Sequence, residues 1–204
     1  FTKAELSDAL VLKAETFANS YLENKGDGNF ELIHLPMEAQ VAPIFGMLND
    51  DINEDGNLDI MLVGNSYATK TALGQYDASK GIVLIGDGEG GFESTPVSKT
   101  GFMVDKDAKG LIRLFGKNGA KYIVSRNNES LQIFDKQVVA LEVILIQATD
   151  NFAIIELKNG KKRKEEFYFG NSYLSQSTRF LPIPNQMKAV QIFDNKGNSR
   201  GLSE

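Results

Sequence analysis

The sequence predicts a mainly β protein, and three observations lead to this fold class. Short apolar or alternating runs of about three to six residues recur from residue 22 onward, as in strands with one buried face. Clusters of Gly, Asn and Asp separate the runs, as in tight turns. Two turns, at residues 26–30 and 88–92, share the pattern GxGxF about 62 residues apart, and this period predicts repeated, partial β-propeller-like blades.

Residues 1–21 are predicted to form an N-terminal amphipathic helix. Thr2 and Glu5 have the spacing of a capping box, which satisfies the first free N–H groups of a helix. Apolar side chains recur at three- and four-residue steps: Leu6, Leu10, Ala14, Phe17 and Tyr21. We expect this helix to pack on the domain that follows.

Residues 22–137 are predicted to form two or three blades. A further copy of the turn would begin near Phe102, where Asp105, Asp107 and Gly110 remain but most oxygen ligands are missing, so we expect a degenerate blade without a metal. The candidate strands are residues 30–35, 60–63, 82–85, 111–115, 122–124 and 131–134.

Residues 138–204 are predicted to form a separate C-terminal β-domain. Leu141, Val143 and Leu145 alternate, and the dipeptide at residues 159–160 is Asn-Gly, the strongest short hairpin signal. Two prolines would place Ile183 at a sheet edge or in a loop. Further candidate strands are residues 167–169, 178–181 and 190–193.

The stretch DINEDGNLD, residues 51–59, has the layout of a calcium loop. Short oxygen-bearing side chains alternate around Gly56, which permits a sharp turn, and a hard cation prefers such oxygens. Leu62 stands where an EF-hand needs a bidentate Glu, so the loop should lead into a strand. A polar β-turn without an ion is the alternative. The expected ligands are the side chains of Asp51, Asn53, Asp55 and Asp59 and the carbonyl of Asn57.

Composition narrows the classes of protein. The absence of cysteine excludes disulfides, thiol catalysis and Cys-ligated zinc. A net charge of −5 argues against nucleic acid as the main partner, and no apolar run approaches about 18 residues, so membrane insertion is not expected.

With these features in place, residues 14–136 resemble FG-GAP or VCBS repeat proteins. Phe45-Gly46 ahead of the acidic loop, the loop itself and Gly64-Asn65 after it carry the resemblance, which implies propeller blades with calcium held between strands. The C-terminal part resembles the ASPIC/UnbV domain through GNSYLSQSTRF, residues 170–180, although Pro-Ile-Pro follows where the family has Gly-Leu-Gly. The stretch ENKGDGNF at residues 23–30, the run at residues 74–92 and the YLSQS segment at residues 173–177 resemble the C-terminal end of very large secreted or surface-attached proteins, so we expect the chain to be part of a larger protein.

Other motifs favour structural roles. Gly86, Gly88 and Gly91 spell GxGxxG, but the following segment is a poor helix, so a hairpin is predicted instead of a nucleotide site. His34 is the only histidine and is predicted to be a structural residue on a strand. The basic run at residues 161–164 is predicted to be a solvated turn.

The aromatic run at residues 167–169 admits two interpretations. Phe167 and Phe169 are predicted to pack in the core, while Tyr168 faces the other side. A sugar-stacking platform that includes Tyr173 is the alternative.

These observations predict a non-catalytic, calcium-binding module of a secreted or cell-surface protein that binds a protein or a glycan. Two alternatives stay open. The chain is a structural terminus that caps a larger propeller, or it is a calcium-assisted glycan hydrolase or lyase that uses Asp77, Asp105 or Asp107.

Overall fold

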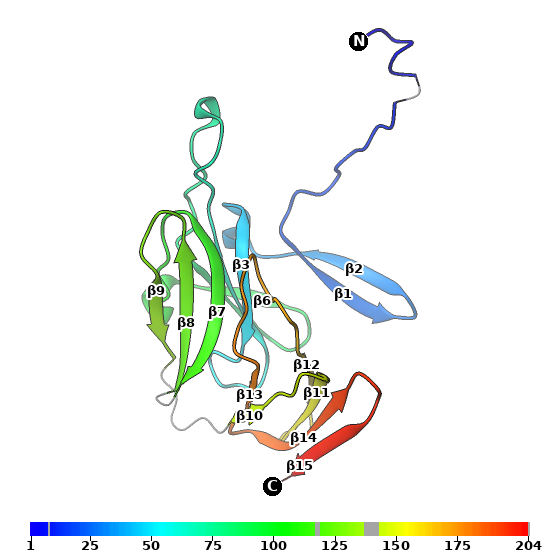
Figure 1. Cartoon of the computed structure of the whole chain (residues 1–204), viewed down its shortest axis with the longest axis vertical. Coiled ribbons are helices and arrows are strands. Elements are labelled where there is room, and N and C mark those ends of the chain that lie inside the picture. The colour runs from blue at the N-terminus through cyan, green and yellow to red at the C-terminus, as the bar shows by residue number, and fades with distance from the viewer. Residues whose placement is uncertain (8, 117–118, 137–142, 204) are drawn as a thin grey trace. The chain divides into compact units, whose positions relative to one another are not determined.

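A computed structural model describes residues 1–7, 9–116, 119–136 and 143–203, and it confirms the mainly β fold class. Strands make up 47% of the structure and helical segments 6%. The chain divides into two compact units, Phe1–Leu35 and Pro36–Glu204, and each is described by itself (Figure 1). Within the described ranges, the strands close into neither a barrel nor a propeller.

The first unit is a β-hairpin, and the predicted N-terminal helix is wrong. Thr2 and Glu5 do form the capping contacts, with the Thr2 N–H 2.7 Å from a Glu5 carboxylate oxygen, but the backbone makes only a turn there. Leu10 and Phe17, from the expected apolar face, are 84% and 87% exposed. A single capped turn does not propagate without tertiary packing, because helix nucleation is unfavourable. Two antiparallel strands follow, β1 (Ser20–Gly26) and β2 (Asn29–His34).

The second unit begins with two antiparallel sheets in which the strands pair in chain order. The predicted apolar runs at residues 60–63, 82–85, 111–115 and 122–124 all lie in these strands. A one-turn helical segment precedes the first sheet, another interrupts it and a third follows it: η1 (Met37–Gln40), η2 (Thr71–Leu73) and α1 (Val97–Thr100). The first sheet contains β3 (Ile44–Asp50), β4 (Asp59–Gly64), β5 (Ile82–Gly86) and β6 (Phe92–Thr95). The second contains β7 (Ala108–Gly116), β8 (Gly119–Arg126) and β9 (Gln132–Asp135).

The two sheets share one hydrophobic core, in which Val63 of β4 packs with Leu111 of β7 and Val124 of β8. Strands β3 and β7 lie side by side (Figure 1). Gly46 of β3 is required at this contact: a Cβ atom there would lie 2.6 Å from Val63 Cγ2 and 2.9 Å from the Leu111 backbone nitrogen. Because no side chain fits, glycine allows the two strand backbones to approach closely.

The C-terminal region has its own core, formed around Ile155, Leu181 and Ile192. The hairpin predicted at residues 159–160 is confirmed, since it joins two antiparallel strands. The predicted strand at residues 167–169 is wrong, because the preceding strand ends at Glu166. The four-stranded sheet has the order β12-β11-β14-β15, from β11 (Asp150–Leu157), β12 (Lys162–Glu166), β14 (Met187–Asp194) and β15 (Ser199–Ser203). A separate pair contains β10 (Val143–Leu145) and β13 (Phe180–Pro182).

The remaining predictions for the C-terminal region are confirmed in part. β13 begins two residues later than the predicted strand at 178–181 and ends at Pro182, so Ile183 lies outside the strand as expected. The predicted strand at 190–193 lies within β14. Leu141, part of the predicted alternation, lies outside the described residues.

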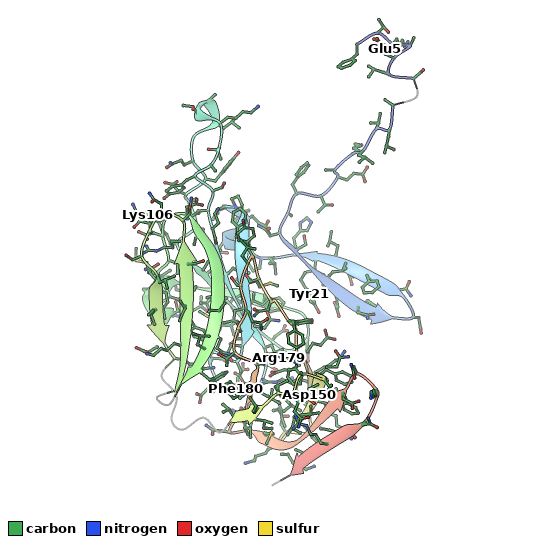
Figure 2. The ribbon with its side chains drawn as sticks, in the orientation of Figure 1. Glu5, Tyr21, Lys106, Asp150, Arg179 and Phe180 are labelled. Carbon is green, nitrogen blue, oxygen red and sulfur yellow. The ribbon has the colours of Figure 1, made fainter. Side chains whose placement is uncertain are left out.

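Residues 172–178 run from the C-terminal region along β3 and β7. The Phe45 carbonyl accepts a hydrogen bond from Ser172 Oγ at 3.2 Å, and the Thr178 N–H donates to the Arg113 carbonyl at 2.9 Å. The segment then leads to Arg179 and Phe180, which Figure 2 labels near Asp150. The Arg179 guanidinium donates to the Asp150 carbonyl at 3.0 Å. This segment therefore satisfies backbone groups that two adjacent strand edges would otherwise expose.

The close approach at Gly46 gives a stability prediction. We expect Gly46→Ala to lower the free energy of unfolding by about 1–3 kcal/mol, because the added methyl group forces β3 away from β7. Urea denaturation measures the change. Gly116→Ala is the matched control, since its Cβ would lie 4.0 Å from the nearest atom. Equal unfolding midpoints for the two variants would contradict the packing argument.

Candidate metal centre

The sequence-predicted calcium loop lies between two paired strands, since β3 ends at Asp50 and β4 begins at Asp59. Gly56 makes the turn with φ +94°, a conformation that L side chains rarely adopt. Two local hydrogen bonds shape the loop: Asp55 N–H donates to Asn53 Oδ1 at 3.1 Å, and Asn57 N–H donates to Asp55 Oδ1 at 2.7 Å. Alternate short side chains thus fold the backbone back on itself, as the sequence predicts.

Asp59 fastens the loop to the first sheet. Its side chain is fully buried, and its two oxygens accept hydrogen bonds from Ile52 N–H at 2.7 Å and from Gly86 N–H at 3.0 Å. Burial raises the pKa of Asp59, and these N–H donors oppose that rise. The carboxylate therefore holds one end of the loop against β5.

Asp51 is the residue whose environment points most directly to a cation. It is 7% exposed, and its Oδ2 accepts hydrogen bonds from Gly56 N–H at 3.0 Å and from Arg163 at 3.3 Å. Its Oδ1 is buried and has no hydrogen-bond partner among the described residues. Burial raises the pKa of Asp51, and the nearby Arg163 guanidinium lowers it in part. A buried carboxylate oxygen without a donor is costly unless a cation satisfies it.

The five predicted ligands offer only oxygen atoms, which fits calcium better than zinc or copper. In the described part of the chain, however, no three His, Cys, Asp or Glu side chains gather into a group that could hold a metal ion. Asn53 Nδ2 donates to Asp55 Oδ2 at 3.0 Å, so the loop uses its own amide to satisfy that carboxylate. Convergence of Asp51, Asn53, Asp55, Asp59 and the Asn57 carbonyl on one ion stays a prediction.

Sequence reasoning missed a buried charge cluster beside the loop. Asp50, 3% exposed, accepts a hydrogen bond from Tyr122 Oη at 2.6 Å and forms ion pairs with Arg113 at 2.8 Å and Lys136 at 3.1 Å. Burial favours the neutral form of Asp50, but the two cations outweigh it, so the pKa of Asp50 is lowered. Lys136 also donates to the Asp51 carbonyl at 2.8 Å. No local pattern in the sequence identifies these partners.

The basic run at residues 161–164 is only partly the solvated turn that the sequence predicts. The side chains of Lys162 and Lys164 are 65% and 50% exposed, whereas that of Arg163 is 12% exposed. Arg163 donates to the Gly56 carbonyl at 2.8 Å and forms an ion pair with Glu165 at 2.9 Å. One residue of the run thus reaches the predicted metal loop.

The glycines at positions 86, 88 and 91 belong to a β-hairpin, as predicted. Strands β5 and β6 are antiparallel, and Gly86 is paired with Phe92 at the turn end of the hairpin. Within the turn, Asp87 accepts hydrogen bonds from the N–H groups of Glu89 and Gly91. No helix begins at Gly91. The helix N-terminus that a dinucleotide fingerprint needs is therefore missing from this described segment.

The remaining candidate residues are dispersed. His34 is exposed on β2, and Asp77 is exposed after η2. Asp105 pairs with Arg126 at 2.9 Å, and Asp107 pairs with Lys109 at 2.6 Å, so both acids of the degenerate turn have protein cations.

Phe167 packs against the C-terminal core as predicted, but the prediction for Phe169 is wrong. Phe169 is 71% exposed, with the Arg179 guanidinium 3.8 Å from its ring centroid.

Comparison with known proteins assigns neither a family nor a function to the chain. No family profile matches the chain, and no curated protein sequence matches it. Among the described residues, no helix combines the length and the apolar composition needed to span a membrane. The resemblance to FG-GAP, VCBS and ASPIC/UnbV sequences therefore stays a prediction.

The buried cluster gives a second stability prediction. We expect Asp50→Asn to lower the free energy of unfolding by about 3–5 kcal/mol, because Arg113 and Lys136 would stay buried without their counter-ion. Chemical denaturation at neutral pH measures the loss. The control is Asp135→Asn, whose side chain is 72% exposed beside Lys121 and should change stability by less than about 1 kcal/mol. Similar losses in the two variants would contradict a special role for the cluster.

Proposed function

We propose that the chain is a non-catalytic, calcium-binding module of a secreted or cell-surface protein, built from partial propeller-type blades and a C-terminal β-domain. One observation carries the proposal: Asp51 Oδ1 is a buried carboxylate oxygen without a donor, within a loop of oxygen-bearing side chains. Calcium would supply the missing positive charge. Asp51, Asn53, Asp55 and Asp59 and the Asn57 carbonyl would hold it.

The affinity follows from the composition of the loop. Three carboxylates and neutral oxygens give dissociation constants of roughly 0.1 to 1 mM in extracellular modules. Such a site fills where free calcium is near millimolar. This range supports a secreted or surface location for the parent protein.

Calcium should stabilise the protein by mass action, because the ion binds only the folded loop. At about 100 times the dissociation constant the expected gain is about 2.7 kcal/mol. Asp55→Ala should remove most of this gain, measured by isothermal titration and by melting with calcium or chelator. Asp194→Ala is the matched control, because Asp194 also caps a polar hairpin turn, by accepting N–H bonds from Lys196 and Asn198.

Two results would contradict the calcium proposal. One is a wild-type melting temperature that is equal in calcium and in chelator. The other is an Asp55→Ala variant that retains the full calcium response while Asp194→Ala behaves identically. A gain with magnesium equal to that with calcium would instead show a non-selective cation site, since magnesium demands a tighter octahedral ligand set.

A partner surface is supported by the exposed aromatic segment that follows β12. Tyr168, Phe169 and Tyr173 are 56%, 71% and 52% exposed. Aromatic rings next to polar groups suit stacking on a sugar or a protein side chain, and Arg179 already holds Phe169 from one face. We propose this segment as the contact surface for the glycan or protein ligand.

The partner surface makes a separate prediction. In a glycan and protein binding screen, Phe169→Ser should lose binding about tenfold or more, because it removes a large exposed contact. Phe17→Ser is the control: this aromatic ring is 87% exposed in the other unit. Unchanged binding by Phe169→Ser to any captured ligand would remove this segment from the proposal.

A structural terminus that caps a larger propeller is the second candidate function. Residues 172–178 already cover the edges of β3 and β7, so further blades would have to pair with β6 or β9, the outer strands at the other ends of the two sheets. A screen that captures no ligand, together with a normal calcium response, would favour this function over a binding module.

A further inference from the structure

Arg163 is aimed from the C-terminal sheet at the predicted calcium loop. On β12, side chains alternate, so Arg163 and Glu165 share one face while Lys162 and Lys164 share the exposed face. The Arg163 Nη1 atom lies 2.8 Å from the Gly56 carbonyl oxygen and 3.3 Å from Asp51 Oδ2. Its Nη2 atom lies 2.9 Å from Glu165, which fixes the other side of the guanidinium.

Further contacts join the same sheet to the loop. Gln186 donates through Nε2 to the Glu54 carbonyl. A Cβ atom on Gly56 would lie 2.8 Å from Leu157 Cδ1, so the loop and β11 are in close contact. The packing of the C-terminal sheet against the loop therefore fixes the position of Arg163, whose side chain is not a mobile surface group.

We propose that Arg163 is the resident counter-cation of the loop: it balances Asp51 when calcium is absent and competes with calcium for Asp51 when the ion binds. This inference rests on the calcium part of the proposed function. Arg163 is thus a positioning residue that sets the calcium affinity. It also couples the ion to the contact between the loop and the C-terminal sheet.

The charges around Asp51 determine the direction in which Arg163 changes the calcium affinity and the stability of the calcium-free protein. A fixed positive charge beside a carboxylate opposes a second cation at the same carboxylate, and charges at such distances change an equilibrium about tenfold or more. Without calcium, the same guanidinium stabilises the Asp51 carboxylate through the ion pair at 3.3 Å and holds the loop at the Gly56 carbonyl. Removal of the charge should therefore strengthen calcium binding and weaken the calcium-free fold. A residue that served only packing would weaken both.

Arg163→Met tests the inference in the full chain, because methionine keeps an apolar stem and removes the charge. We expect the calcium dissociation constant to fall about tenfold. The melting temperature in chelator should fall by roughly 5–10 °C. Isothermal titration and differential scanning calorimetry give the two values. Lys162→Met is the matched control: it removes the same charge from the neighbouring, 65% exposed position and should change neither value appreciably.

A measurement on the wild-type protein keeps the test valid if Arg163→Met does not fold. Calcium should shift the side-chain Nε–Hε resonance of Arg163 in a titration followed by nuclear magnetic resonance. The signal is assigned by its loss in Arg163→Lys. The Arg126 resonance is the internal control, because Arg126 pairs with Asp105 in the degenerate turn. An Arg163 signal that does not move while calcium binds would overturn the inference.

The outcomes separate this inference from the proposed function. Calcium binding of equal affinity by wild type, Arg163→Met and Lys162→Met overturns the inference and leaves the calcium function standing. Binding by Arg163→Met alone supports the role of Arg163 and overturns calcium binding by the wild type. An absence of binding in all three proteins overturns both.

Discussion

The buried carboxylate of Asp50 is the constraint on which the arrangement around the loop depends. It is 3% exposed and needs two cations and a phenol, from Arg113, Lys136 and Tyr122, to remain ionised in that environment. These partners come from β7, β8 and the segment after β9, so the second sheet can occupy only a position that brings them to the end of β3. The hydrophobic core supplies most of the driving force for burial, but it is not directional. The charge cluster adds the directional requirement.

The charge cluster around Asp50 also helps to order the 51–59 loop that follows it. The loop starts at a residue that Lys136 holds, is tied to β5 through Asp59, and is held by Arg163 at Gly56. A polar turn with three such attachments has little freedom left to lose when a ligand binds. Preorganisation of this kind favours affinity, because the cost of ordering is met on folding. The carboxylates of Asp59 and Asp51 already accept hydrogen bonds from Gly86 and Arg163, so a bound ion would have to share or displace these contacts.

Local patterns predicted much of the fold, and long-range contacts account for what they missed. The runs at β4, β5, β7 and β8, the hairpin at residues 159–160 and the turn at Gly56 follow from neighbouring residues alone. The N-terminal helix failed although its capping contacts form, because a helical stripe requires a surface to pack on. The prediction of a strand at residues 167–169 is wrong, because β12 ends at Glu166 and the chain then leads to the segment that lines β3 and β7. The loop was recognisable from its spacing, but the contact with Arg163 spans 112 positions, and no spacing rule reaches that far.

In both acidic turns of this chain, carboxylates lie close together in sequence, and the protein places cations beside them to different extents. In the degenerate turn, Asp105 and Asp107 each have a nearby protein cation, Arg126 at 2.9 Å and Lys109 at 2.6 Å. In the 51–59 loop, one guanidinium serves one oxygen of Asp51, and the other oxygen stays without a donor among the described residues. Acidic turns without any cation would carry a repulsive cost in the folded state. Protein cations therefore lie beside both acids of the first turn, whereas the 51–59 loop has one protein cation beside Asp51. In our proposal, that partial balance leaves Asp51 open to calcium, and Arg163 lowers the calcium affinity while it stabilises the calcium-free fold.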